Sequence, residues 1–152
     1  MLGTMTTMEK RIESLAELKE EARRFVSTLP KAKGRATLVT LSGELGAGKT
    51  AFTQAVGEAL SVKERMTSPT FALLKTYPLP PPARWKHLVH IDAYRLKGGG
   101  ELAPLLFNEL QSDPDTLLLV EWPERVREAL PRPDVAITLV VDTPSHRRVI
   151  YD

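Results

Sequence analysis

The sequence has 152 residues, with 21 Lys and Arg against 19 Asp and Glu, and it contains no cysteine. The length fits one domain, and 42% hydrophobic with 26% charged residues is a composition that excludes a disordered chain. A net charge of +2 is too small for a protein that coats nucleic acid or a membrane, and zero cysteine excludes a disulfide framework, a thiolate zinc site and a cysteine nucleophile.

Membrane and export signals are weak along the whole sequence. No stretch approaches the roughly 20 apolar residues that a membrane helix needs. The first residues, MLGTMTTMEKRIESL, lack the apolar centre of a secretory signal. We therefore expect a cytoplasmic protein with no membrane contact, formed by a single domain over residues 1–152, with 1–8 as a candidate disordered segment.

The first half of the chain alternates between helical and strand patterns. Apolar residues recur at helical spacing over 15–29, and Ser14 with Glu17 predicts a capping box at the start of this helix. Residues 36–41 (ATLVTL) predict a short buried strand that runs into a glycine-rich turn. The turn is followed by the core stripe of a second helix, made of Phe52, Ala55, Val56, Ala59 and Leu60.

The second half is richer in strands. Residues 71–77, 88–92 and 117–121 predict strands, and 135–141 with 147–151 predict a hairpin around 142–145. Three consecutive glycines, 98–100, predict a flexible turn. This order favours an α/β fold with helices on both faces of a central sheet, to whose edge the hairpin adds antiparallel strands.

The glycine-rich turn carries the strongest chemical signal. Its sequence, GELGAGKT, matches the phosphate loop G-x-x-x-x-G-K-[ST], and the motif has the required strand before it and helix after it. We therefore expect a P-loop NTPase fold with a parallel central sheet, binding ATP and Mg²⁺. The backbone would wrap the phosphates, Lys49 would reach the β- and γ-phosphates, and the Thr50 hydroxyl would ligate Mg²⁺. The predicted nucleotide contacts are Gly43, Glu44, Leu45, Gly46, Ala47, Gly48, Lys49 and Thr50. In the alternative, a plain strand-to-helix turn, nothing requires Lys49 and the backbone amides of the turn to converge.

A P-loop enzyme also needs a carboxylate at the end of a neighbouring strand, to hold or polarise the hydrated metal. Glu121 ends the apolar run LLLV, and Asp92 ends the run LVHI. Together with Lys49 they are the candidate catalytic residues, and with Thr50 the candidate metal site. The alternative for each acid is a solvated strand end, and the sequence does not divide the two roles between them.

Other polar positions carry weaker signals. Thr67, Ser68 and Thr70 predict a switch that senses the γ-phosphate, or else an ordinary turn. His90 shares a strand face with Asp92, which favours a buried or supporting role beside Asp92 over a zinc site. Arg95 and Arg147 are candidate arginine fingers, with solvated surface residues as the alternative. Lys31, Lys33 and Arg35 form a small basic cluster that would bind tRNA weakly or simply face solvent.

The motifs taken together are more specific than each one. GELGAGKT, TSPTF, HIDAYRL and VEWPER, in this order over about residues 12–151, resemble the bacterial TsaE family. The resemblance implies a P-loop ATPase needed for threonylcarbamoyl modification of adenosine-37 in tRNA. Such proteins act with the TsaB–TsaD complex and reset it through ATP hydrolysis. The small net charge predicts that tRNA contact is indirect or weak. If neither candidate arginine acts as a finger, hydrolysis by the isolated protein should be slow, and TsaB–TsaD should speed it.

The same resemblance assigns individual residues. Lys49 and Thr50 match the phosphate and Mg²⁺ ligands, Glu121 the family's metal-associated glutamate, and Asp92 the aspartate of its HxDxYR motif. His90, Tyr94 and Arg95 belong to the same motif, whereas Trp122 and, more loosely, Arg147 match residues near the nucleotide. The Lys97–Gly100 segment departs from the acidic stretch that is typical of the family.

Two other functions fit a P-loop in a chain of this size. The first is a small-molecule kinase, although no arginine-rich lid follows the helix after the P-loop. The second is a non-catalytic binding module, in which ATP occupancy sets the affinity for a partner.

Overall fold

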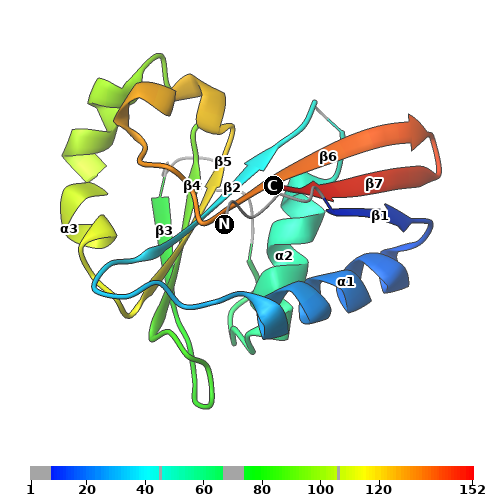
Figure 1. Ribbon diagram of the computed structural model, residues 1–152, viewed down its shortest axis with the longest axis horizontal. Coiled ribbons are helices and arrows are strands. Elements are labelled where there is room, and N and C mark those ends of the chain that lie inside the picture. Colours follow the sequence, from blue (N-terminus) through cyan, green and yellow to red (C-terminus); the bar gives the residue numbers. More distant parts are fainter. Residues whose placement is uncertain (1–7, 45, 67–73, 106) are drawn as a thin grey trace, which may run out of the picture.

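The fold is organised around one seven-stranded sheet, which a computed structural model describes for residues 8–44, 46–66, 74–105 and 107–152 (Figure 1). The strands are β1 (Met8–Ile12), β2 (Thr37–Ser42), β3 (Leu74–Pro78), β4 (His87–Asp92), β5 (Thr116–Glu121), β6 (Val135–Thr143) and β7 (His146–Tyr151). The α-helices are α1 (Leu15–Thr28), α2 (Lys49–Ala59) and α3 (Phe107–Gln111). Three 3₁₀ segments complete the described chain: η1 (Gly99–Leu105), η2 (Pro123–Arg125) and η3 (Arg127–Ala129).

The strand order is β1-β7-β6-β2-β5-β4-β3, with parallel pairing from β6 through β2 and β5 to β4. The predicted P-loop NTPase fold, with a parallel central sheet and antiparallel edge strands, is confirmed. The hairpin of β6 and β7 lies at one edge as expected, and β3 adds a second antiparallel edge beside β4. The hairpin is extended by β1, which the sequence did not predict, and Met8 therefore belongs to a strand rather than to a disordered segment.

The central strands are buried on both faces because helices and turns cover the sheet on both sides. All six residues of β5 are buried, as are five of the six in β2, which explains their nearly continuous apolar runs. Figure 1 shows α1 and α2 on one face, with α3 and the 3₁₀ segments on the other. The prediction of helices on both faces is confirmed, although short turns cover much of the second face.

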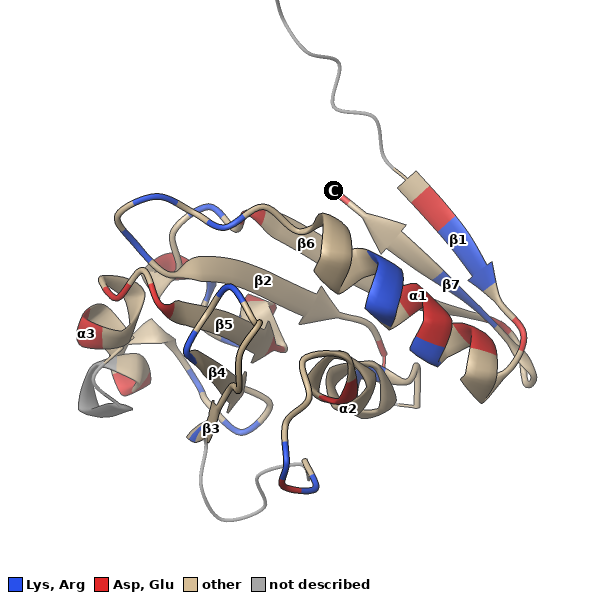
Figure 2. Ribbon diagram, turned by 90° about the horizontal axis from the view of Figure 1, so that it is seen from below, with Lys and Arg blue, Asp and Glu red and all other residues tan. Residues whose placement is uncertain are grey.

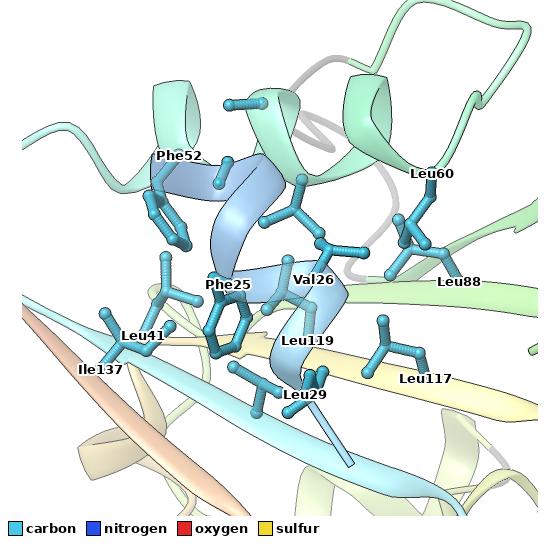
Figure 3. Packing of buried hydrophobic residues seen from close by; sticks show 14 of the residues in the cluster. Phe25, Val26, Leu29, Leu41, Phe52, Leu60, Leu88, Leu117, Leu119 and Ile137 are labelled. Carbon is cyan, nitrogen blue, oxygen red and sulfur yellow. The ribbon is translucent and has the colours of Figure 1, made fainter. Parts of the chain in front are cut away.

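Each face has its own apolar core. On the first, Phe25 of α1 and Phe52 of α2 pack over Leu41 and Leu119 of the sheet (Figure 3). Phe25 also stacks on Tyr151 of β7, with ring centroids 5.5 Å apart, so that α1 is fixed to the edge hairpin. On the second face, Phe107 and Val126 belong to a cluster with alternate residues of β2, β4 and β5.

The parallel strands bring their carboxyl ends to one edge of the sheet. The segment 43–48 leaves the end of β2, Asp92 ends β4, and Glu121 ends β5. Asp92 and Glu121 are register partners, and Leu41 of β2 is opposite Glu121 on its other side. In open α/β sheets, ligands bind at this carboxyl edge, so the candidate site residues lie where the fold favours a site.

Candidate functional site

The turn between β2 and α2 has a backbone that glycine makes possible. Gly48 has φ of 102°, in the left-handed region that other residues rarely adopt. Gly43 passes so close to β6 that a Cβ atom there would lie 2.7 Å from the carbonyl oxygen of Leu139. The Ala47 N–H donates to the Glu44 carbonyl at 3.0 Å and closes the turn. The glycines are therefore required by the conformation and by the approach of a neighbouring strand.

Helix α2 begins directly at the end of this turn. Gly48 is its N-cap residue and provides no side-chain cap, and the first turn of the helix contains no acidic residue. The first N–H groups of a helix have no acceptor within the helix, and they carry its positive dipole end. The start of α2 is therefore suited to bind an anion such as phosphate.

Lys49 lies at the centre of the site, with 6% of its surface exposed. Its Nζ donates to the carbonyl oxygens of Gly43 and Glu44, the latter at 3.0 Å, and lies 4.0 Å from the centroid of the Trp122 ring. Burial lowers the pKa of Lys49, while the surrounding carboxylates oppose this shift: Glu121, Glu124, Asp92 and Glu44. The structure thus holds a single ammonium group among four acids at the base of the turn.

Glu121 is a buried carboxylate, exposed by 2%, and this excludes the solvated strand end as its description. Its Oε2 contacts His90 Nε2 of β4 and accepts from Thr53 Oγ1 of α2 at 3.4 Å. His90 is itself buried, as expected, with 1% of its surface exposed, and the partner of its Nε2 is Glu121. Alternation along β4 places His90 and Asp92 on the α2 face, but the Asp92 Oδ1 accepts from the Tyr94 N–H at 3.0 Å, in the turn that follows the strand.

Aromatic side chains border the site on the side of β4 and β5. Trp122 has φ of 57°, and its N–H donates to the Leu41 carbonyl at 3.1 Å. Its ring meets that of Tyr94 with centroids 4.9 Å apart, and the Arg125 guanidinium lies 5.4 Å from the centroid of Tyr94. The rings of Trp122 and Tyr94 thereby form a wall that begins at the Lys49 ammonium.

Arg147 approaches the turn from the hairpin. Its Nη2 donates to the Gly46 carbonyl at 3.4 Å, and its Nη1 donates to the Thr143 carbonyl at 3.0 Å. Thr50 is exposed in the first turn of α2, and Arg95 is exposed on the loop after β4. Four predicted residues lie outside the described residues: Leu45, Thr67, Ser68 and Thr70.

The small basic cluster lies elsewhere, before β2, and two of its three members are ion-paired. Arg35 binds Asp134 with an N–O distance of 2.8 Å, and Lys31 lies 3.4 Å from Asp115. Figure 2 shows both signs of charge along α1 and β1. The two ion pairs favour an ordinary mixed surface for the cluster itself.

Two residues that the sequence analysis did not single out belong to the site. Thr53 lies four residues after Lys49, hence on the same face of α2, and this spacing could have identified it. Glu124 contributes its charge near Lys49 because the chain turns at Trp122 after β5. No periodic pattern in the sequence predicts that turn.

The oxygen donors available at the site fit magnesium. Thr50, Asp92 and Glu121 offer hydroxyl and carboxylate oxygens, which this hard cation prefers. Within the described residues, no three His, Asp, Glu or Cys side chains are grouped as a complete metal site. Magnesium is usually held by one or two carboxylates, waters and the phosphates of a substrate, so this donor set suits an ion that arrives with a nucleotide.

Comparison with known proteins decides the family. A family model described as "Threonylcarbamoyl adenosine biosynthesis protein TsaE" matches residues 12–150. The chain belongs to the TsaE family. The expectation drawn from its four motifs is therefore confirmed.

Individual TsaE proteins support this assignment. The chain is 35% identical over 146 residues to the "tRNA threonylcarbamoyladenosine biosynthesis protein TsaE" of Rickettsia bellii, covering 91% of this chain and 88% of that protein. It is 46% identical over 98 residues to the protein of the same name from Streptomyces coelicolor, and this match spans 61% of each chain. The crystal structure of Bacillus subtilis YdiB superposes with a TM-score of 0.70 at 27% identity, covering 96% of this chain and 84% of that one.

None of the described helices combines the length and the apolar character that crossing a bilayer would require.

Proposed function

We propose that this TsaE-family chain serves tRNA threonylcarbamoyladenosine biosynthesis as a magnesium-dependent ATPase that acts with the TsaB–TsaD complex. The observation that carries the ATPase proposal is the convergence on Lys49. A buried ammonium, the uncapped start of α2 and the acids that end β4 and β5 meet at one edge of the sheet. The names of the family and its relatives support the pathway.

The phosphates of ATP would bind to the N–H groups at the start of α2 and to Lys49. Lys49 would exchange two neutral carbonyl acceptors, those of Gly43 and Glu44, for charged phosphate oxygens. Hydrogen bonds between charged partners are about twice as strong as neutral ones, so this exchange favours the nucleotide-bound state. The Thr50 hydroxyl would hold Mg²⁺, which neutralises negative charge on the phosphate oxygens when it is bound.

Hydrolysis would proceed by in-line attack of water on the γ-phosphorus. The new bond joins the water oxygen to phosphorus, and the bond from phosphorus to the oxygen that bridges to the β-phosphate breaks. One proton of the water stays on the released phosphate, the other passes to solvent, and ADP leaves with the bridging oxygen. Glu121 is fixed by His90 and Thr53, and we assign it the orientation of the attacking water. Asp92, half-buried at the outer end of β4, would bind the water shell of the metal. Lys49 and the loop amides stabilise the charge that develops on the phosphoryl oxygens.

The test of this function is Lys49→Ala, with Lys33→Ala as the matched control because Lys33 is exposed before β2, away from the loop. Loss of the ammonium should weaken ATP binding about 100-fold and abolish turnover. Calorimetric titration and phosphate release measure the two effects. Wild-type turnover by the Lys49→Ala protein would contradict the proposal. ATP-dependent phosphorylation of a nucleoside or small acid would instead establish a kinase.

A further inference from the structure

Thr53 of helix α2 directs its hydroxyl to another element of the fold. Its side chain is buried, with 1% of the residue exposed, and Oγ1 donates to Glu121 Oε2 of β5 at 3.4 Å. Threonine hydroxyls within helices often bond to a carbonyl one turn earlier instead. Thr28 does so in α1, where its Oγ1 donates to the carbonyls of Arg24 and Phe25. The contact of Thr53 with β5 is therefore a particular feature of α2.

Two contacts converge on a single oxygen of the Glu121 carboxylate. Within the described part of the chain, Thr53 Oγ1 and His90 Nε2 are its side-chain partners, and both meet Oε2. A carboxylate offers acceptor sites on each of its two oxygens. The protein thereby holds Oε2, which leaves Oε1 as the oxygen that can accept a hydrogen bond from the attacking water.

His90 is not itself held from its far side. Its second ring nitrogen, Nδ1, is buried and has no hydrogen-bond partner among the described residues. A histidine that supports a functional group is commonly oriented by a hydrogen bond of its other nitrogen. Because His90 lacks this bond, Thr53 supplies the second constraint on where Glu121 Oε2 lies.

Thr53 also connects Glu121 to the element that would hold the phosphates. It lies four residues after Lys49, about 6 Å further along the axis of α2 and on the same face. This part of α2 is packed into the core, where Phe52 is fully buried (Figure 3). At 3.4 Å, the hydrogen bond to Glu121 is about 0.6 Å longer than is usual between two oxygens. A small displacement of α2 therefore changes how firmly Glu121 is held.

Resting on the proposed ATPase function, we propose that Thr53 is a positioning residue that couples phosphate binding at the start of α2 to the orientation of Glu121. The phosphates fix the start of the helix, and Thr53 passes that position on to Oε2. Oε1 then orients the water that attacks the γ-phosphorus. Misplacement by about 1 Å can cost about 100-fold in rate. Hydrolysis thus depends on the position of α2 as well as on the presence of the nucleotide.

The test separates the hydroxyl of Thr53 from the shape of its side chain. Thr53→Val keeps the branched shape and removes the hydroxyl, whereas Thr53→Ser keeps the hydroxyl. Thr116→Val is the matched control, because Thr116 is also 1% exposed and its hydroxyl also donates to a carboxylate, that of Asp113 at 3.2 Å, at the other end of β5. Calorimetric titration gives the dissociation constant of Mg·ATP, and phosphate release with TsaB–TsaD present gives kcat and KM.

We expect Thr53→Val to lower kcat about tenfold, the effect of one lost hydrogen bond, while the dissociation constant and KM of ATP change by less than about twofold. Thr53→Ser should keep kcat within about threefold of the wild type, and Thr116→Val should leave it unchanged. If Thr53→Val does not fold, Thr53→Ala takes its place with the same expected values. Undiminished kcat without the hydroxyl, or an equally low kcat in Thr53→Ser, would overturn the proposal.

A second comparison tests whether the effect passes through Glu121. In the Glu121→Gln background, Thr53→Val should lower kcat no further, because the carboxylate that Thr53 orients is gone. An equal loss in both backgrounds would give Thr53 a structural role independent of Glu121 and would overturn the coupling. Absence of ATP hydrolysis by the wild-type chain with TsaB–TsaD would instead overturn the proposed function itself.

Discussion

Glu121 differs from most strand-end acids in that two neighbouring elements hold its carboxylate. His90 contacts it from β4, Thr53 donates to it from α2, and 2% of its surface is exposed. Such an arrangement fixes the orientation of a carboxylate more tightly than its backbone position alone would. Precise orientation matters in phosphoryl transfer, where positioning and electrostatics provide most of the catalysis.

Replacing Glu121 with Gln should separate binding from chemistry. The amide keeps the size of the side chain and removes the charge that orients water, so ATP affinity should change little while turnover falls about 100-fold. Phosphate release and calorimetric titration give the two numbers. Glu124→Gln is the control, since Glu124 is exposed and contributes charge near Lys49 without the buried contacts. Undiminished turnover in Glu121→Gln would remove Glu121 from the mechanism.

The sequence predicted some features of the site and not others. Lys49, Asp92 and Glu121 follow from a motif and from the ends of two apolar strands, and all three meet in the structure. The contact between His90 and Glu121 depends on the parallel register of β4 and β5, which pairs Asp92 with Glu121. Register across strands distant in sequence is set by tertiary packing, so no local pattern in the sequence contains this contact.

At the scale of secondary-structure elements, Asp134 connects two strands: it lies directly before β6 and forms hydrogen bonds with β2. Its carboxylate accepts from both Nη atoms of Arg35 and from the Leu38 N–H at 2.8 Å. The Asp134 N–H donates in turn to the Leu38 carbonyl at 2.8 Å. The hydrogen bonds from Arg35 hold the pKa of Asp134 below its usual range. This acid therefore fixes where two parallel strands begin to pair.

Asp134→Ala should lower the free energy of unfolding by about 2 kcal/mol at neutral pH, because charge-assisted hydrogen bonds are lost at a half-buried position. A carboxyl whose pKa is lowered by folding stabilises the protein above its unfolded-state pKa of about 3.9. That contribution disappears as pH falls through the folded-state pKa. The gap between wild type and variant in urea unfolding should therefore shrink below about pH 4. Asp134→Asn is the control, because it keeps the size of the side chain and removes its charge. A difference in stability between wild type and Asp134→Ala that persists in acid would contradict this account.

Elements with strong periodicity were predicted within a residue or two. The helix expected over 15–29 is α1 (Leu15–Thr28), and the strand expected over 36–41 is β2 (Thr37–Ser42). The missed strand β1 buries Ile12 but exposes its other four residues, so its sequence lacks alternation and its pairing with β7 defines it. The predicted flexible glycine turn is instead packed: a Cβ atom on Gly99 would lie 2.5 Å from that of Ala129 in η3.

At the scale of the whole molecule, we expect a partner protein to contribute to catalysis at the site. Arg147 reaches the loop, but its guanidinium is bonded to the carbonyls of Gly46 and Thr143 and serves the architecture of the loop. An arginine finger raises phosphoryl-transfer rates by about 10³–10⁵ where one acts. On the proposed function, we therefore expect full activity only when TsaB–TsaD is bound.

The isolated chain should hydrolyse ATP slowly, and TsaB–TsaD should accelerate turnover at least about tenfold, since electrostatic groups at the transferred phosphoryl are worth that or more. Phosphate release is measured for the chain, the partner complex and the mixture, with the Lys49→Ala chain in the mixture as control. Fast turnover that the partner leaves unchanged would contradict the prediction. Binding that depends on ATP but not on its cleavage would identify a nucleotide-gated module.

The pairing of β1 with β7 has a consequence for how the molecule forms. Arg11 of β1 meets His146 of β7 across a separation of 135 residues, and the five residues of β1 pair in register with β7. During synthesis, β1 leaves the ribosome long before its neighbour exists, and loop closure over such a distance is slow. The edge hairpin is thus the last part of the sheet to be completed, and until then β7 carries an open edge that could recruit another chain. When β1 pairs with β7, β1 becomes the edge of the sheet instead, and its charged residues Glu9, Lys10 and Arg11 disfavour the addition of another strand.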